Sequence, residues 1–551
     1  MNKGMFGFPE RNRDDMFHGF PKKKVSGESF FGFPSGSEDY DFKCDANTSN
    51  FTFSMTIRST LGARIIIDKG DGGQIVDIGT GNDKAITWTY SQINRYNINF
   101  YGDTLELKKI VIVTKRLTGT LQQKTVEKFL NVETFNISNG TISGNIPDFN
   151  KCLNLIDFRV NNQSFSSTLP NFSSCSLLSV FLVNNNQLSG ELPSFNNNIS
   201  LSNFQCNFNL FTGELPSFAS CIQLVTFRLN NNKFSGTLPS FSSNTLLQTF
   251  DISTNQFSGT LPSFNNLTNL VTFNCSVNQF SGNIPTFSGC TSLQNFYAGG
   301  NLNAWTGIIP YFPESLRVFD YTNASSATLE FPYDIFNNLL NLTEINIPRV
   351  RISGTRTFPN ISNNTNLARL YITDNVNSEI KFDNGTIVFN TSKLTWLYSR
   401  NMDGVALDLT NLQMLPTSNY FTYTSASFGN IEYPLGSKII GTNGMEIGLF
   451  DNGITQVNVD ATIVNLFNGR NNFINNGTTK RLNIGGAGQY GTANAAPSGT
   501  YQQPAGFNHD LTEAQIDALT TTVKEKIWIL VNCQMSIADT TKRYKWTITT
   551  N

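Results

Sequence analysis

The stretch LVTFRLNNNKFSGTLPSF, residues 224–241, contains the pattern that organises most of this 551-residue sequence. Its proline belongs to a series that recurs every 23 residues, with a glycine (once a serine) three positions earlier and a phenylalanine two positions later. The series consists of Pro147, Pro170, Pro193, Pro216, Pro239, Pro262 and Pro285, and Pro310 follows after a two-residue insertion. A fixed period of this length predicts stacked copies of one structural unit, here called coils.

The residue types in the unit predict the course of each coil. The segment L-x-x-F-x-Φ alternates apolar and polar residues, which is typical of a short strand with one buried face. Glycine permits a tight reversal, proline favours an extended return, and no helix of useful length fits between Phe218 and Leu224. We therefore expect 3₁₀ or polyproline-like backbone on the convex side. One asparagine per coil should hydrogen-bond to neighbouring backbone: Asn186, Asn209, Asn232, Asn255, Asn278 and Asn301.

The unit resembles a leucine-rich repeat, in the variant in which a glycine precedes a Leu/Ile-Pro step. The resemblance implies an α/β-type but strand-dominated solenoid whose parallel strands stack ~4.8 Å apart. A leading apolar residue extends the array to about 13 coils: Leu107, Val132, Leu155, Leu178, Leu201, Leu224, Leu247, Leu270, Leu293, Leu316, Leu342, Leu367 and Leu394.

The positions of the cysteines predict buried free thiols rather than a disulfide framework. Cys206 and Cys275 replace aliphatic residues of the strand core. A second position in the coil holds either cysteine or asparagine: Cys152, Cys175, Cys221 and Cys290, with Asn198 and Asn244 in other coils. Small buried side chains explain this usage, which agrees with assembly in a reducing cytosol.

The repeats divide the chain into four predicted parts. Residues 1–41 form an extended docking peptide, 42–104 a small β-sandwich, 105–420 the solenoid and 421–551 an α/β cap. In the sandwich, IIIDKGDGG and YSQINRYNINFYG resemble a PKD-like domain, and the Asp-Gly segment is expected to be a hairpin turn rather than a calcium loop. In the cap, ITQVNVDATIVNLF and LTEAQIDALTTTVKEK have helical spacing, whereas RLNIGG and IWILVN predict strands that continue the sheet.

The N-terminal peptide carries a repeat of its own, an aromatic-Gly-Phe-Pro motif in three copies. Such a segment has too little apolar content for a core, so it is either an unstructured tail or a peptide that docks into equivalent pockets of a partner. We favour docking, through Phe6, Gly7, Phe8 and Pro9, then Phe17, Gly19, Phe20 and Pro21, then Phe31, Gly32, Phe33 and Pro34.

Composition narrows the classes of function. With 39 basic and 40 acidic residues the net charge is -1, which argues against nucleic acid as a partner. No apolar run approaches the ~18 residues of a membrane span, and the N-terminus lacks the apolar core of a secretory signal. Only His18 and His509 are present, so we expect neither a metal site nor a cofactor.

The concave strand face is the predicted binding surface, because its side chains point outward in a regular array. Amides beside aromatic rings suit a polyol, although a merely solvated face is the alternative. The predicted ligand-binding residues are Asn136, Arg159, Leu182, Gln205, Phe208, Arg228, Asn230, Asp251, Asn274 and Tyr297. Glu191 and Glu214 are the best candidates for a catalytic carboxylate pair, but their coil position favours solvated turn residues, so no enzyme is expected.

The whole organisation resembles a bacteriophage fibre or receptor-binding protein, and the span from NGTTKRLNIGG through NAAPSG resembles the terminal caps of repeat proteins from viruses of Bacteroidetes-type bacteria. This implies a non-enzymatic virion protein, made in the host cytoplasm. Its N-terminal peptide would bind capsid or tail proteins, and its repeats would bind a host-surface glycan or protein. The alternatives are a bacterial surface adhesin or scaffold and, less favoured, a polysaccharide-degrading enzyme.

Overall fold

The computed structural model describes residues 40–300, 304–321, 328–347, 351–352 and 359–373, together with isolated strands as far as residue 549. The docking peptide, the two predicted cap helices, the predicted strand IWILVN, Asn301 and Cys533 lie outside the described residues.

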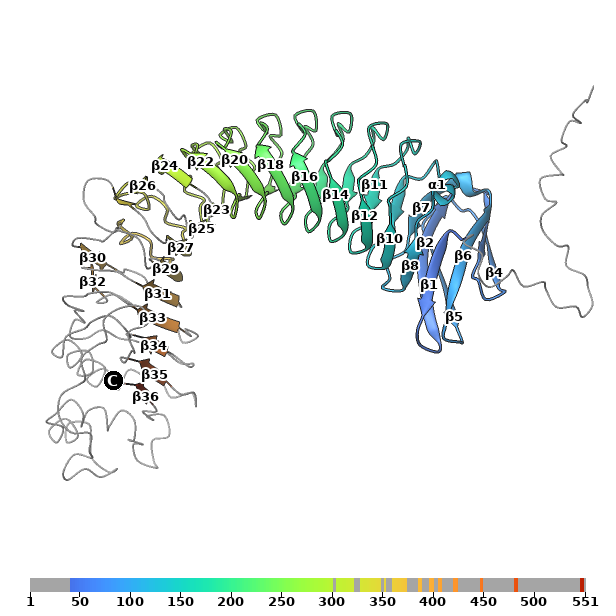
Figure 1. Ribbon diagram of the computed structural model, residues 1–551, viewed down its shortest axis with the longest axis horizontal. Coiled ribbons are helices and arrows are strands. Elements are labelled where there is room, and N and C mark those ends of the chain that lie inside the picture. The colour runs from blue at the N-terminus through green and yellow to red at the C-terminus, as the bar shows by residue number, and fades with distance from the viewer. Residues whose placement is uncertain are drawn as a thin grey trace, which may run out of the picture. The chain divides into compact units, whose positions relative to one another are not determined.

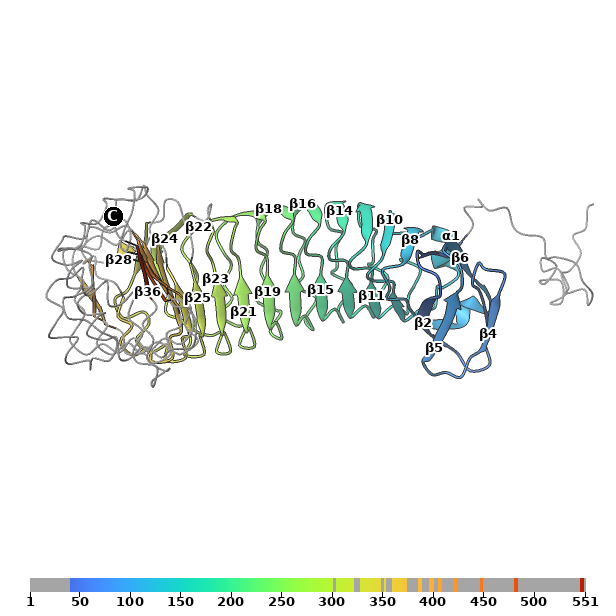
Figure 2. The ribbon, with the colours of Figure 1, turned by 90° about the horizontal axis from the view of Figure 1, so that it is seen from below.

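One parallel strand in each coil builds the first sheet, and every strand pairs in register with the next (Figure 2). Each strand begins at the leading apolar residue of its coil or two residues after it, so every predicted coil contains one. These strands are β7 (Leu107–Val111), β9 (Thr134–Asn136), β11 (Asp157–Arg159), β13 (Val180–Leu182), β15 (Asn203–Gln205), β17 (Thr226–Arg228), β19 (Thr249–Asp251), β21 (Thr272–Asn274), β23 (Asn295–Tyr297), β25 (Val318–Asp320), β27 (Glu344–Asn346), β29 (Arg369–Thr373) and β31 (Trp396–Arg400).

The first sheet continues into the C-terminal region. The additional parallel strands are β33 (Tyr420–Thr424), β34 (Glu446–Gly448), β35 (Lys480–Asn483) and β36 (Trp546–Thr549), and β30 (Gly385–Val388) pairs separately with β32 (Val405–Asp408). The strand predicted in RLNIGG is therefore present, as β35.

A second parallel sheet lies on the other side of the coils, where the sequence predicted no strand (Figure 1). The N-x-F-S-G segment forms it, because its backbone groups pair with the next coil rather than within their own. No helix forms between Phe218 and Leu224, as predicted; two turns occupy the segment, closed by the hydrogen bonds that Cys221 N–H donates to Phe218 O and Leu224 N–H donates to Cys221 O. The strands are β8 (Leu117–Thr120), β10 (Thr141–Gly144), β12 (Ser164–Ser167), β14 (Gln187–Gly190), β16 (Leu210–Glu214), β18 (Lys233–Thr237), β20 (Gln256–Gly259), β22 (Gln279–Gly282), β24 (Ala304–Ile308), β26 (Thr328–Phe331) and β28 (Arg351–Ile352).

The N-terminal strands extend both sheets of the solenoid. β2 pairs antiparallel with β7, and β1 pairs antiparallel with β8, so the end of the array is covered by hydrogen-bonded strands. A 3₁₀ turn (Thr104–Glu106) precedes the first coil, and α1 (Gln123–Glu127) lies within it. The sandwich strands are β1 (Phe42–Ala46), β2 (Phe51–Ser59), β3 (Arg64–Asp68), β4 (Gln74–Ile78), β5 (Lys84–Tyr90) and β6 (Asn94–Gly102).

The Asp-Gly segment between β3 and β4 is a hairpin turn, as predicted. The Oδ1 atom of Asp68 accepts a hydrogen bond from the Gly70 backbone, and the Oδ1 atom of Asp71 accepts one from Gly73. Both carboxylates therefore serve the turn itself, which is the ordinary role of aspartate at this position.

Columns of stacked phenylalanines fill the core between the sheets. Phe227 of β17 lies 5.4 Å from Phe204 and 5.6 Å from Phe250, measured between ring centroids, and both pairs are stacked. Phe218 meets the same column edge-on, 4.9 Å from Phe227. The inward side chains of the second sheet form a further column, which includes Phe257 and is fully buried, as predicted. The stacking continues the hydrophobic core without interruption from one coil to the next.

The predicted asparagine ladder joins each coil to its neighbours. Asn232 Nδ2 donates to the backbone oxygens of Cys206 at 3.1 Å and Leu229 at 2.9 Å, and its Oδ1 accepts from the Phe211 N–H at 3.0 Å. Each such side chain satisfies buried backbone groups that an apolar residue would leave unpaired. The same arrangement occurs at Asn186, Asn209, Asn255 and Asn278.

The position shared by cysteine and asparagine has one structural role. Cys221 Sγ lies 3.4 Å from the Phe195 carbonyl oxygen, and Asn244 Nδ2 lies 3.1 Å from the equivalent oxygen of Phe218. All seven described cysteines are buried and free, as predicted. Burial raises the pKa of the Cys175 and Cys221 thiols to about 11, so they stay protonated and unreactive at neutral pH.

Candidate functional site

The outward face of the first sheet carries two parallel rows of side chains, which we call the trailing and leading rows. In each three-residue strand the central residue is buried, and the residues on either side of it point outward; Ile110 of β7 and Leu370 of β29 are the equivalent buried residues. The trailing row, after the buried residue, contains Val111, Asn136, Arg159, Leu182, Gln205, Arg228, Asp251, Asn274, Tyr297, Asp320, Asn346 and Tyr371. The leading row contains Lys109, Thr134, Asp157, Val180, Asn203, Thr226, Thr249, Thr272, Asn295, Val318, Glu344 and Arg369.

The structure places the predicted strand residues in the trailing row, from Asn136 to Tyr297. Sequence reasoning missed the leading row. The row follows from strand geometry, because residues i and i+2 of a strand point to the same face. It also missed the continuation through Asp320, Asn346 and Tyr371, where longer connections obscure the 23-residue period.

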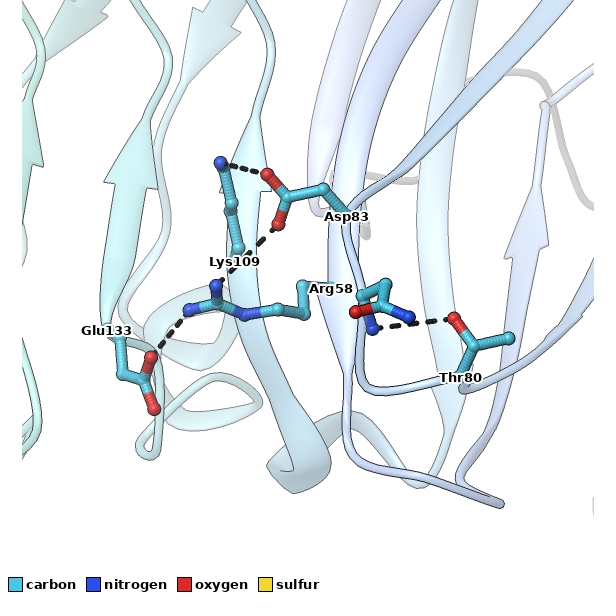
Figure 3. A network of polar contacts seen from close by, with 6 residues as sticks. Arg58, Thr80, Asp83, Lys109 and Glu133 are labelled. Atoms are coloured by element: carbon cyan, nitrogen blue, oxygen red, sulfur yellow. Dashed lines mark hydrogen bonds and ion pairs between the residues drawn. The ribbon is translucent and has the colours of Figure 1, made fainter.

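A charged network occupies the N-terminal end of this face, where the sandwich meets the first coils (Figure 3). Arg58 of β2 lies between two carboxylates, 2.6 Å from Glu133 and 3.7 Å from Asp83, and Lys109 approaches Asp83 at 2.5 Å (Figure 3). These groups neutralise one another, and their partial exposure limits each pair to ~0–1 kcal/mol of stability. The network connects the sandwich to the solenoid and presents little unpaired charge to a ligand.

The centre of the face is mostly neutral. Arg228 is exposed beside Asp251 of the next strand, and Thr226, Thr249 and Thr272 lie in register in the leading row. Asp251 Oδ1 accepts hydrogen bonds from the backbone N–H of Ser253 at 3.1 Å and from its hydroxyl at 2.7 Å. Burial raises the pKa of Asp251, and these hydrogen bonds and Arg228 oppose the rise.

The C-terminal end of the described face combines tyrosines with carboxylates. Tyr297, Asp320, Asn346 and Tyr371 are successive in the trailing row, and Asn346 Nδ2 donates to Asp320 Oδ2 at 3.3 Å. Burial, followed by the negative charges of Glu344 and Asp320, raises the pKa of Tyr297. The tyrosines therefore remain neutral hydrogen-bond donors at physiological pH.

A column of left-handed residues borders the face where each strand turns away, and it contains the predicted site residue Phe208. The remaining predicted residue, Asn230, lies just before this column, at the same coil position as Asn207. The members are Asn139, Asn162, Asn185, Phe208, Asn231, Thr254 and Val277, all with φ between 53° and 65°. Where asparagines are consecutive they form a ladder, since Asn185 Nδ2 donates to Asn162 Oδ1 at 2.7 Å.

The candidate catalytic carboxylates lie on the second-sheet side of the coils. Both side chains are exposed, as predicted, but only Glu191 follows its strand, whereas Glu214 is the last residue of β16. A depression of about 530 Å³ on the turns of the later coils contains one carboxylate, and a glycosidase needs two. Its lining residues are Glu314, Asn337, Asn338, Leu340, Asn341, Ser362, Asn363 and Thr365.

Other predicted features are tested only within the described residues. There, no group of three or more His, Cys, Asp or Glu side chains has the arrangement of a metal site. No helix of the described part is long and apolar enough to span a membrane. The phenylalanines, glycines and prolines of the docking peptide, together with His18 and His509, lie outside it.

No protein-family model and no curated protein matches this sequence. Among solved structures, the chain is similar to the LRR ectodomain of the Arabidopsis receptor kinase HAESA, with 20% identity over 66% of this chain and 65% of that one (TM-score 0.45). It is also similar to the ectodomain of GASSHO1/SCHENGEN3 from Arabidopsis thaliana, with 18% identity over 66% of this chain and 52% of that one (TM-score 0.41).

A bacterial structure is similar as well: the functional domain of InlJ from Listeria monocytogenes, which includes a cysteine ladder, with 15% identity over 64% of this chain and 76% of that one (TM-score 0.36). The chain spans from about half to two thirds of the two plant ectodomains, 52% and 65% of their lengths. The 23-residue repeat and the parallel pairing of its strands show that this chain is a strand-dominated solenoid of the leucine-rich-repeat kind.

Proposed function

We propose that the protein is a non-enzymatic binding protein whose ligand lies across the outward face of the first sheet. One observation carries the proposal: two in-register rows hold exposed and half-buried polar and aromatic side chains along many coils, on a backbone made rigid by inter-coil hydrogen bonds. Such preorganised arrays suit recognition of an extended surface, because little conformational entropy is lost on binding.

The central face should therefore determine attachment. Combining Arg228→Ala, Asp251→Asn and Tyr297→Ala is expected to weaken binding to host cells or their glycans about tenfold or more, as removal of central aromatic and arginine contacts does elsewhere. Asparagine at position 251 keeps the acceptor for Ser253, as Asn274 does for Ser276 in the next coil. The measurement is the amount of labelled full-length protein that remains bound to cells.

The control carries Ser220→Ala, Gln223→Ala and Ser243→Ala, which are exposed on the opposite turns. Unchanged attachment of the face variant, with its fold intact by circular dichroism, would place the binding surface elsewhere.

We further propose that the protein is a bacteriophage fibre or receptor-binding protein, anchored to capsid or tail proteins by the peptide 1–39. The three aromatic-Gly-Phe-Pro motifs support this, because linked copies raise avidity when a symmetric oligomer offers equivalent pockets. A bacterial adhesin would use the same sheet face but would not need these motifs for assembly into a particle.

Deletion of residues 1–39 is expected to leave a folded protein that no longer co-purifies with virions. The truncation stops before Tyr40 because Tyr40 and Asp41 are buried, and Asp41 Oδ2 accepts hydrogen bonds from Lys128 and the Phe100 backbone, both at 2.7 Å. Quantitative immunoblotting of purified particles gives the incorporated amount. Normal incorporation of the truncated chain would indicate that the sandwich anchors the protein, and it would contradict the peptide hypothesis.

A further inference from the structure

The backbone at Phe208 has a conformation that its side chain disfavours. Phe208 has φ 55°, in the left-handed region where bulky residues are rare and asparagine is readily accommodated. The coils on either side have asparagine at the same position, Asn185 and Asn231. Backbone hydrogen bonds hold the strained residue in place, since its N–H donates to Asn230 O at 2.9 Å and its carbonyl accepts from Asn186 N at 3.2 Å.

Burial of the Phe208 ring does not offset the strain of its backbone. The Phe208 side chain is 50% exposed, and Leu210 beside it is 45% exposed. An exposed aromatic residue in a strained conformation stabilises the fold less than the asparagine of the adjacent coils would. Strain of this kind persists where the surrounding structure imposes it, and it is concentrated at ligand-binding positions.

A second, independent feature lies next to the ring. Asn207 is only 9% exposed, and among the described residues no donor lies within hydrogen-bonding distance of its buried Oδ1. A buried acceptor without a donor is costly, and a donor group of a ligand would satisfy it. Asn184 and Asn230 occupy the same position in the adjacent coils, which places further amides beside it.

We propose that Phe208, Asn207 and Asn230 form a subsite for a neutral pyranose, the aromatic ring stacking on the C–H face and the amides contacting hydroxyls. This proposal rests on the proposed function, since it names the ligand class of the same binding face. Residues 183–187 and 206–210 contain no charged side chain, whereas exposed Arg228 and Lys233 flank Asn230 in the next coil. A sugar hydroxyl is a suitable donor for Asn207 Oδ1, and a ring face of C–H groups matches an exposed aromatic.

The test compares full-length proteins on an array of neutral pyranosides, followed by titration calorimetry with the sugar that the unaltered chain selects. Phe208→Asn is expected to lower the affinity at least tenfold, without lowering the melting temperature, because it restores the residue of the neighbouring coils. Phe208→Tyr keeps the ring and should retain affinity. Val277→Asn is the matched control, since it relieves the same backbone conformation (φ 53°) in another coil and should leave the affinity unchanged.

Asn207→Ala should also weaken binding at least severalfold, and preferentially for sugars that retain the hydroxyl it contacts. The proposal is overturned if the chain binds no neutral pyranoside, or if the Phe208→Asn and Val277→Asn variants bind the sugar equally well. It is also overturned if the Phe208-dependent attachment to host cells is removed by protease, which degrades proteins, and not by periodate, which oxidises glycans. If Phe208→Asn attaches normally while the Arg228, Asp251 and Tyr297 variant does not, this subsite is wrong and the proposed function stands. If neither variant loses attachment, both fail.

Discussion

Replacing Asn255 with alanine is expected to lower the free energy of unfolding by at least about 3 kcal/mol, because it leaves three buried backbone groups without partners, each costing ~1–3 kcal/mol. Its Nδ2 donates to the oxygens of Leu229 and Ile252, both at 3.1 Å, and its Oδ1 accepts from the Phe234 N–H at 3.1 Å. The measurement is chemical denaturation followed by circular dichroism, together with hydrogen exchange of the Phe234 amide.

Gln256→Ala is the control, because Gln256 is the next residue and is exposed. It should change stability by less than ~0.5 kcal/mol, which is usual for surface substitutions. A comparable loss in both variants would show that the asparagine has no special role. In Asn255→Ala the Phe234 amide should lose protection first, since stability in a solenoid depends on contacts between nearest neighbours.

The second large effect is expected from Phe257→Ala, which should cost about 3–5 kcal/mol, the usual range for emptying a buried aromatic site. Phe257 is fully buried, with ring centroids 6.0 Å from Phe234 and 6.2 Å from Phe280. The vacated volume lies between two rigid coils whose backbones are fixed by strand pairing, so collapse around it is limited.

Unfolding of Phe257→Ala is measured against Leu210→Ala, which removes an apolar side chain that is 45% exposed. The exposed site should lose much less stability, because most of its surface already contacts water. A loss below ~1 kcal/mol for Phe257→Ala would contradict close packing of this column.

Local patterns predicted the first sheet, the buried phenylalanines and the asparagine ladder. Each depends on chemistry that repeats at one position, such as the amide at Asn232 and its equivalents, so the period alone identifies it. The outward face of the first sheet could be predicted to the same extent, since the trailing row from Asn136 to Tyr297 follows from strand alternation.

The second sheet could not be predicted, because a strand such as Gln256–Gly259 is four residues long and lacks a clear alternating pattern. Its hydrogen bonds all join different coils, so only stacking creates it. The same reason applies to the junction between the predicted sandwich and the solenoid, where β1 pairs with β8 and β2 with β7 across many residues of sequence.

The sequence by itself therefore determined the repeat, the inward and outward positions of the first strand, and the polar side chains that satisfy buried backbone. Tertiary structure alone decided the continuous face that joins Arg58 to Arg369 through paired strands, and the left-handed conformation imposed on Phe208. The physical reason is that hydrogen bonds between coils fix the backbone of each turn, so a residue takes the conformation of its neighbours even where its own side chain disfavours it.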